Sequence, residues 1–409
     1  MRHFKETFVV FASTALNFLF SYAVHFFLGR FLGPVEYGKY GVVLNLAWIT
    51  GIPFSAVGAS FVKFSAIFNA KNEIPKVKFL LVNFLKFSFL INLLFTIGYI
   101  IFSGVLSDSL GGGINYLIII LSFSFPISGL NSLFLWLFQS LKRVYIYSIL
   151  NTLSSFFKLI IIILLVLSGW GVFGALWGLV FSGLGVLFLC LPFIFKYLRS
   201  DSVKVSFKPI ISFGLTVFFA NFFINLVLYF DLFFVSSSLG DEQAGFYNAA
   251  VTLSRAFLMS GSVMAVFFPV FNSDFTLSNF SKLRSSVKLA LLYTSLICFA
   301  GLFVFWFFSD FIVSVTYSSS FLPTVPILHV LALGYSFFSL FNVLVNALWS
   351  TGKYKITGIF GVVLFLLDII LLYFLVPIFG VMSAAWITTI LLGLLFVFSL
   401  IIVFRLIKD

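Results

Sequence analysis

Charge is scarce in this sequence: 9% of its 409 residues are Asp, Glu, Lys or Arg, whereas soluble domains carry about 25%. Hydrophobic residues make up 62% of the chain, and its mean hydropathy is +1.20. No water-soluble fold could bury that much apolar side chain, so the composition indicates an integral membrane protein. A transmembrane barrel would alternate in polarity over segments of about 10 residues. These runs are longer and apolar on all sides, so we predict an all-α membrane protein.

Cysteine and the motifs of soluble enzymes are also nearly absent. Cys190 and Cys298 both lie inside apolar runs, which argues against a disulfide framework and gives no metal-ligand spacing. The sequence has no phosphate-binding loop ending in Lys-Ser/Thr, no His-Glu-x-x-His and no Cys-x-x-Cys. No connection between apolar runs exceeds about 15 residues, which leaves no room for a soluble catalytic domain or an ATPase module. We therefore expect no catalytic residue, no metal and no cofactor.

Twelve apolar runs are long enough to cross a hydrocarbon core of about 30 Å at about 1.5 Å per residue. They cover residues 6–29, 39–66, 79–103, 114–140, 144–168, 171–195, 209–238, 246–272, 286–309, 322–350, 356–379 and 381–404. Six runs per half is an even number, so both halves enter the membrane in the same direction. We predict two six-helix lobes, 1–195 and 209–409, joined by a basic linker, 196–208. A pseudo-two-fold axis along the membrane normal should relate them.

Two internal repeats support this division. The polar turn 33–40 recurs as 240–247, with the same spacing of two glycines and a tyrosine, at an offset of 207 residues. The stretch 171–177 recurs as 380–386, at an offset of 209 residues. Two repeats at nearly one offset indicate one unit of about 200 residues used twice.

Positive charge gathers on alternate connections. Arg30 and Lys39 are the only basic residues in the odd-numbered connections, where Glu36, Asp108, Asp241, Glu242 and Asp310 oppose them. The even-numbered connections and the two ends hold eighteen of the 24 basic residues: Arg2, Lys5, Lys71, Lys76, Lys78, Lys142, Arg143, Lys196, Arg199, Lys204, Lys208, Lys282, Arg284, Lys288, Lys353, Lys355, Arg405 and Lys408. The positive-inside rule then places both termini on the cytoplasmic side of the inner (cytoplasmic) membrane. An anionic cytoplasmic leaflet explains the net charge of +12 without a nucleic-acid partner.

Four charged residues lie well inside the runs: Lys158, Asp231, Arg255 and Asp368. A charge near the bilayer centre costs at least about 2.5–3.5 kcal/mol on insertion scales, so such groups normally face a wet cavity or a partner. Lys63 and Lys86 lie near cytoplasmic ends, where a long side chain can reach the interface.

The run 246–272 carries the clearest polar face. Its members follow the helical spacing i, i+4, i+7, i+11, i+14: Asn248, Thr252, Arg255, Met259 and Ser262. Lipid chains form no hydrogen bonds with a polar helix face, so we expect this face to line water or substrate. Arg255 is our candidate for contact with a phosphate, and the alternative is a structural pair with Asp231.

The first run has a looser polar stripe at i+4 steps, made of Ser13, Asn17, Ser21 and His25. Such residues either line a cavity or hydrogen-bond between packed helices, and the sequence leaves both open. His25 alone is more typical of a packed interior residue than of a proton relay.

Equivalent positions of the two repeats carry opposite charge, because an offset of 210 residues aligns Lys158 with Asp368. A structural ion pair across the lobes would explain this, and so would a cavity with one basic and one acidic wall. The sequence does not choose between them.

Together these features resemble the polysaccharide flippases, the Wzx-like branch of the multidrug/oligosaccharidyl-lipid/polysaccharide exporter superfamily. The residues that carry the resemblance are the turn 30–40, Asp231, the turn 239–247, Phe268-Pro269 and the stretch 375–386. The resemblance implies two six-helix lobes around a cationic cavity, which move an isoprenoid-diphosphate-linked glycan from the inner to the outer leaflet. Arg30, Lys63 and Arg255 are then the candidate cations for the diphosphate. We expect the glycan lipid, membrane lipids and glycan-assembly proteins as partners of a functional monomer.

Two other functions stay open. A cation-coupled multidrug exporter of the same fold would use acidic residues in its cavity, whereas here Asp231 and Asp368 are opposed by Lys158 and Arg255. A membrane-embedded glycosyltransferase or polymerase would need catalytic residues on a sizeable outer loop, which this chain lacks. A receptor or scaffold is disfavoured by the repeat and the embedded charges.

Overall fold

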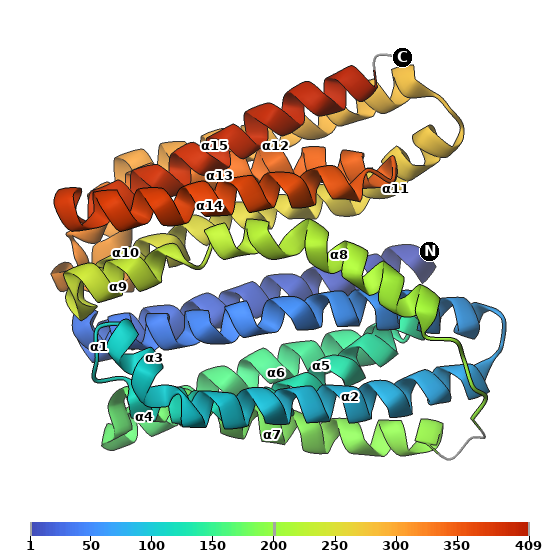
Figure 1. Cartoon of the computed structure of the whole chain (residues 1–409), viewed down its shortest axis with the longest axis horizontal. Coiled ribbons are helices and arrows are strands. Elements are labelled where there is room, and N and C mark those ends of the chain that lie inside the picture. The colour runs from blue at the N-terminus through green and yellow to red at the C-terminus, as the bar shows by residue number, and fades with distance from the viewer. Residues whose placement is uncertain (1, 199–201, 408–409) are drawn as a thin grey trace. The chain divides into compact units, whose positions relative to one another are not determined.

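A computed structural model describes residues 2–198 and 202–407 (Figure 1). Arg199 and Lys408, which the topology prediction uses, lie outside these residues. Within them the chain forms helices and no strand, which confirms the all-α prediction. The elements are α1 (Arg2–Ala70), α2 (Ile74–Ile101), α3 (Ser103–Ser109), α4 (Asn115–Ser122), α5 (Ser124–Ser140), α6 (Val144–Leu165), η1 (Val166–Trp170), α7 (Gly171–Leu198), α8 (Lys208–Val227), α9 (Asp231–Leu239), α10 (Asp241–Ser254), η2 (Arg255–Ser262), α11 (Val263–Thr276), α12 (Phe280–Thr316), η3 (Ser319–Phe321), α13 (Thr324–Ser350), α14 (Tyr354–Phe379) and α15 (Val381–Leu406).

In the part of the chain that the structure describes, nine helical stretches are long and apolar enough to cross a membrane, or ten if one bent pair is counted as a span. Two of the nine are too long for one crossing. Ala12–Ala70 has 59 residues and would measure about 90 Å as a straight helix. Figure 1 shows α1 turning at its label and running back beside itself. Val144–Ile194 is interrupted in the same way by positive-φ glycines, Gly169 and Gly171. The count of twelve spans stays a prediction.

The repeated glycines share one backbone conformation. Gly33 has φ 72° and ψ 175°, and Gly240 has φ 86° and ψ 174°. Side chains other than hydrogen are almost excluded from this region of backbone space. Gly171 and Gly380, from the second repeat, also have positive φ, 52° and 72°. The repeats found in the sequence therefore make the same kind of sharp break between consecutive helices.

The chain divides into two compact units, 1–218 and 219–409. Each unit has its own apolar core, with Phe61, Leu80 and Phe138 central in the first. Phe271, Val287 and Leu344 are central in the second. The division falls inside α8, and the predicted limits 1–195, 196–208 and 209–409 stay predictions.

In the second unit, α13 is the central helix. In its most apolar window 72% of the residues are buried, against 17% for the peripheral α12. Small residues let its neighbours approach closely, as is usual between membrane helices. A Cβ atom on Gly334 of α13 would lie 2.9 Å from the backbone of Thr389 in α15. Thr389 donates a hydrogen bond of 2.9 Å to the Val330 carbonyl of α13, which fastens α15 to the helix that carries part of the candidate site.

Candidate substrate site

The structure groups buried polar side chains within the second unit, beginning where the predicted run 209–238 breaks. The α8 helix ends at Val227, and the next turn is closed by short i to i+3 bonds, such as Tyr229 N to the Leu226 carbonyl at 3.1 Å. The α9 helix then starts at Asp231. A helix start leaves amide donors free and favours an acidic side chain. The break therefore creates a place inside the membrane where a carboxylate is accommodated.

Asp231 is buried and fully engaged by hydrogen bonds. Its Oδ1 accepts from the Leu232 amide at 2.7 Å. Its Oδ2 accepts from the Tyr247 hydroxyl at 2.5 Å and from Thr388 Oγ1 at 3.1 Å. These contacts join α9, α10 and α15. Tyr247 belongs to the repeated turn 240–247, so the repeat also supplies a ligand to this carboxylate.

Arg255 lies between two tyrosines. Its guanidinium carbon is 4.8 Å from the centre of the Tyr229 ring, a cation–π geometry. The Tyr335 hydroxyl of α13 accepts a hydrogen bond from it. Its Nη2 atom is buried and has no hydrogen-bond partner in the described part of the chain. The two tyrosines thus hold the plane of the guanidinium and leave one buried donor available to an acceptor.

A direct ion pair between Arg255 and Asp231 does not form. Among the residues that the structure describes, no contact within 4.0 Å joins the guanidinium to the Asp231 carboxylate, although the two charges attract one another. Asp231 is satisfied by hydroxyls and an amide. The alternative of a structural pairing between Arg255 and Asp231 has no direct ion-pair contact among the described residues, and it stays open.

Asp368 of α14 presents an unsatisfied carboxyl. It is buried, and neither Oδ1 nor Oδ2 has a hydrogen-bond partner among the residues that the structure describes. The nearby charge of Asp231 repels it. A carboxylate without partners in such surroundings is costly and requires a proton or a cation.

Unsatisfied polar atoms gather along the α10–η2 segment. Within the described residues, Asn248 Nδ2, Ser254 Oγ and Ser260 Oγ are buried without hydrogen-bond partners, like Arg255 Nη2. Thr252 is also buried. Native structures leave few buried polar atoms unpaired. A segment with four of them inside one unit is a candidate for binding a polar ligand.

The α-helical spacing on which the polar face along 248–262 was predicted holds only to Ser254. The chain is α-helical to Ser254 and then forms a 3-10 helix over Arg255–Ser262. At about 3.0 residues per turn, Met259 is rotated by about 80° from its α-helical position. Met259 is accordingly exposed. The side chain of Ser262 is outside the described part.

The first unit holds the other predicted site residues along α1. Ser13 donates to the Ser148 carbonyl of α6 at 3.0 Å and lies 2.9 Å from Thr152 Oγ1, so its role is helix packing. Asn17 is half-buried, and its Oδ1 has no hydrogen-bond partner among the side chains that the structure describes. Ser21 of α1 and Lys158 of α6 are both half-buried.

His25 joins an aromatic cluster. Its Nδ1 is 3.0 Å from the Tyr37 hydroxyl, and its ring meets Tyr40 edge-on at 6.1 Å. Tyr37 and Tyr40 are buried, and Tyr40 is the repeat equivalent of Tyr247. The repeated tyrosine therefore contacts a titratable side chain in both units.

The two remaining candidate cations are at the surface. Arg30 is exposed at the end of the first arm of α1. Lys63 is exposed too, and its Nζ lies 3.7 Å above the Phe213 ring. Arg255, Asp231, Asn248 and Thr252 thus belong to one unit, whereas Asn17, Ser21, His25, Arg30, Lys63 and Lys158 belong to the other. A single cavity that joins the two groups stays a prediction.

Sequence reasoning missed Tyr229, Tyr247, Tyr335 and Thr388 as site residues. One signal could have found the tyrosines. The chain has 62 Phe and only 15 Tyr, so a tyrosine inside an apolar run stands out as a place where a hydroxyl is used. Thr388 carries no such signal.

Comparisons with known proteins agree on a transporter architecture. The profile of a family described as "Polysaccharide biosynthesis protein" matches residues 4–275. A Shigella flexneri protein with the provisional name O-antigen transporter is 25% identical over 378 residues, which cover 88% of this chain and 87% of that protein.

Solved structures show the same fold. An inward-facing multidrug-resistance transporter of the MATE family, in the MOP superfamily, superposes with a TM-score of 0.81 at 15% identity and covers 96% of each chain. The lipid II flippase MurJ, in an inward closed conformation, superposes with a TM-score of 0.74 at 16% identity. That match covers 99% of this chain and 88% of the flippase.

Proposed function

This chain belongs to the polysaccharide biosynthesis protein family, and on that premise we propose that it is a flippase for a lipid-linked glycan. Its substrate is an isoprenoid-diphosphate-linked oligosaccharide, carried from the cytoplasmic to the outer leaflet by alternating access through a cationic cavity. It acts as a monomer in the inner membrane with both termini in the cytoplasm, has no catalytic residue, and serves glycan-assembly proteins. The Shigella flexneri relative and the flippase MurJ support the substrate class.

The observation that carries this proposal is the buried donor of Arg255, held between Tyr229 and Tyr335. A diphosphate drawn bare through hydrocarbon would cost tens of kcal/mol. A guanidinium offers a planar fork that matches phosphate oxygens and stays charged when partly desolvated. Asn248 and Ser254 add buried polar atoms that can hydrogen-bond to sugar or phosphate. Arg255 is therefore the diphosphate-binding residue of this proposal, with Thr252 and Ser262 on the same segment and Asn17, Ser21, His25, Arg30 and Lys63 as further cavity residues.

The chain's own chemistry points to a gradient as the driving force. A membrane potential of about 100 mV, negative inside, favours the outward movement of negative charge. Moving about two negative charges outward therefore releases roughly 4–5 kcal/mol. The Asp231 and Asp368 carboxyls offer a second source of driving force, which is the binding of an ion. Neither oxygen of Asp368 has a hydrogen-bond partner among the described residues, so a proton or cation taken up there compensates a buried charge. Uptake and release of that ion can be coupled to the transport cycle, with Lys158 as the corresponding embedded charge of the first unit.

The alternative of a cation-coupled multidrug exporter rests on the same acids and on the MATE-like fold. The two functions make opposite demands on Arg255. A cationic drug gains nothing from a buried guanidinium, whereas a diphosphate requires one. A membrane-embedded glycosyltransferase or polymerase finds no supporting observation in the site.

The test is export of the glycan by a strain that lacks its own polysaccharide flippase and expresses this chain. Arg255→Ala should abolish surface glycan while the protein inserts normally, and Arg255→Lys should keep partial export. Lys86→Ala is the matched control, because Lys86 is an exposed residue outside the site. If Arg255→Ala combined with Asp231→Asn restores export, the phosphate-binding role is refuted. If the wild-type chain instead confers drug resistance without glycan export, the multidrug function replaces the flippase function.

A further inference from the structure

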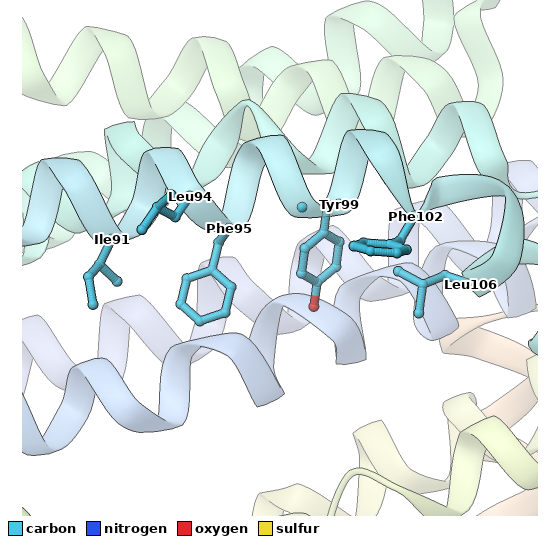
Figure 2. A pocket seen from close by; sticks show the side chains of 7 residues that line it. Ile91, Leu94, Phe95, Tyr99, Phe102 and Leu106 are labelled. Carbon is cyan, nitrogen blue, oxygen red and sulfur yellow. The ribbon is translucent and has the colours of Figure 1, made fainter.

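An apolar groove of about 470 Å³ on the first unit shows how this chain faces lipid. Figure 2 shows its labelled side chains projecting from α2 and α3, among them Ile91, Phe95 and Leu106. Its one hydroxyl, that of Tyr99, lies 2.6 Å from Thr50 Oγ1 and is thus paired within the protein. Any hydrocarbon chain of the bilayer can fill such a groove. Accessible amide or indole N–H groups inside a membrane helix therefore require a different neighbour.

The central helix α13 has such groups in its last three turns. Asn342, Asn346 and Trp349 follow the spacing i, i+4, i+7 and therefore lie on one face of the helix. All three are half-buried, whereas every residue that lies between them in the sequence is buried. These three residues, here called the α13 stripe, are thus the accessible part of an otherwise buried segment.

The polar groups of the α13 stripe remain available to a ligand. Within the described part of the chain, the Asn342 carboxamide makes no hydrogen bond. Asn346 Nδ2 donates to the Asn342 carbonyl at 2.7 Å, which leaves Asn346 Oδ1 free to accept. Trp349 Nε1 is buried and has no hydrogen-bond partner among the residues that the structure describes. An asparagine that serves helix packing bonds to a neighbouring helix, as Asn131 does to the Gly183 carbonyl at 2.8 Å, and the two asparagines of the stripe do not.

The α13 stripe continues the face of α13 that holds Arg255. Tyr335 accepts a hydrogen bond from Arg255, and it precedes Asn342 by seven residues, so the two lie on one face about 10 Å apart along the axis. Between them Ser339 donates to a backbone carbonyl of η2 at 2.8 Å, which closes this part of the face. After α13 comes Lys353, which the charge pattern places in the cytoplasm. The stripe therefore extends from the candidate diphosphate site toward the cytoplasm.

The chemistry of the α13 stripe fits a sugar. Its donors and acceptors are uncharged, so it lacks the positive charge that favours a phosphate, and it lacks the apolar wall that suits a hydrocarbon. Sugar hydroxyls both donate and accept, and a carboxamide can answer both. The C–H faces of a sugar ring pack on aromatic rings. Trp349 offers such a ring beside its N–H group, and the Tyr354 ring lies 6.1 Å from it.

We propose that Asn342, Asn346 and Trp349 bind the first sugars of the glycan as it is loaded from the cytoplasmic side. The proposal rests on the flippase function, because that function supplies a glycan beside the diphosphate. With the diphosphate at Arg255, the sugars linked to it extend toward Asn342, about two helical turns farther along α13. Loading then depends on the sugar as well as on the phosphate, since a site that hydrogen-bonds hydroxyls disfavours a ligand without them.

The test is the binding of two probes to the full chain in lipid nanodiscs. One probe is the lipid-linked glycan of the strain used for the export assay. The other is a polyprenyl methyl diphosphate of the same chain length, which carries the same diphosphate charge and no sugar. The native chain should bind the glycan probe at least about fivefold more tightly, a difference equivalent to about 1 kcal/mol. Equal affinity for the two probes overturns the proposal.

Substitutions in the α13 stripe locate the sugar contacts. Asn342→Leu replaces the carboxamide by an apolar group of similar shape, and Trp349→Phe removes the N–H but keeps an aromatic ring. Each should weaken binding of the glycan probe about three- to tenfold, equivalent to about 0.7–1.4 kcal/mol, and leave the methyl diphosphate probe unaffected. Arg255→Ala should weaken both probes. Asn83→Leu and Trp306→Phe are the controls, because Asn83 bonds to its own helix in the first unit and Trp306 is exposed on α12.

Two outcomes refute the α13 stripe as a sugar site. If the folded Asn342→Leu and Trp349→Phe proteins keep the full preference for the glycan probe, the stripe binds water only. If they lose affinity for both probes equally, the stripe supports the shape of the site and does not contact sugar. Thermal unfolding of each variant identifies the folded proteins.

Export measured with the same proteins separates the two proposals. A chain that restores glycan export but binds the two probes equally retains its flippase function and loses the sugar contacts on α13. A chain that prefers the glycan probe through Asn342 and Trp349 but never restores export keeps the sugar contacts and loses the flippase function.

Discussion

At the scale of single residues, tyrosine hydroxyls organise the charged groups of the second unit. Tyr247 donates to Asp231, and Tyr335 accepts from Arg255. A phenylalanine would fill the same space, and this chain uses phenylalanine four times as often. The hydroxyls therefore set the orientation of the two charged side chains, which their burial alone would not fix.

Tyr335→Phe tests this orientation. A hydrogen bond to a charged group contributes about 1.5–3 kcal/mol, so we expect export to fall about tenfold or more while the protein remains folded. The measurement is the initial rate of glycan export at several carrier-lipid concentrations. Tyr293→Phe is the control, because Tyr293 is exposed on α12. An equal loss in both variants would mean that the Tyr335 hydroxyl has no special role.

Asp368→Asn should separate stability from activity. Replacing an unpartnered carboxylate by an amide of the same shape removes a buried charge, so the variant should unfold at a higher temperature, by an equivalent of about 1–3 kcal/mol. It should also lose the dependence of transport on an imposed ion gradient. Thermal unfolding in detergent and transport in liposomes measure the two effects. Asp310→Asn, at an exposed position, should change neither. A destabilised Asp368→Asn protein would show that the carboxylate has a structural role.

Sequence analysis identified the charges at this scale but not their partners. Arg255, Asp231 and Asp368 are conspicuous because charge is costly in an apolar run. Tyr335 and Thr388 lie far from them in the sequence, and hydroxyls are common in membrane helices as packing residues. Only the fold brings Thr388 to within 3.1 Å of the Asp231 carboxylate.

At the scale of helices, the glycine breaks are the most predictable feature. Gly33 and Gly240 stood out in the sequence by their repetition, and both have the backbone angles that glycine alone adopts easily. The 3-10 segment Arg255–Ser262 was not predictable. A change from i+4 to i+3 bonding needs no special residue, and the sequence keeps an α-helical polar spacing through it.

Alanine at either repeated glycine should destabilise the protein. Gly33→Ala and Gly240→Ala should each cost about 1–3 kcal/mol, since a Cβ atom is strained at these angles. Gly51→Ala is the control within α1, because its Cβ position is open and its backbone is helical. That change should be neutral or stabilise by about 0.5–1 kcal/mol through better helix propensity. The measurement is thermal unfolding of the purified variants. An unchanged unfolding temperature for Gly240→Ala would contradict the predicted strain at this position.

At the scale of the whole molecule, the membrane topology follows from charge. Single cysteines at Lys142, Lys282 and Lys353, and at both termini, should escape an impermeant thiol reagent added outside sealed cells, because the positive-inside rule places them in the cytoplasm. Cysteines at Asp108 and Asp310 should react. The native Cys190 and Cys298 are buried and give a low background. Labelling of a cysteine at position Lys142 in sealed cells would contradict the predicted topology.

The opposite charges at equivalent repeat positions give a second test at this scale. Lys158 belongs to one unit and Asp368 to the other, and their pairing stays a prediction. If they form a cross-lobe pair, Asp368→Asn should lower export, and exchanging the two residues should restore part of it. No recovery in the exchanged protein would assign them separate roles as cavity walls. The two-fold rotation that should superpose the first six predicted spans on the last six stays a prediction.

The matching glycine breaks also have an evolutionary consequence. A chain that makes the same turn twice, at Gly33 and Gly240, has the form of a duplicated and fused gene. Two separate identical subunits share one sequence, so a lysine at a position in one subunit is also present at the same position in the other. Fusion releases the copies from that constraint. Lys158 could then diverge from Asp368 without the change being copied into the other half. The two halves of such a protein can therefore acquire different charged side chains at equivalent positions and take different parts in transport.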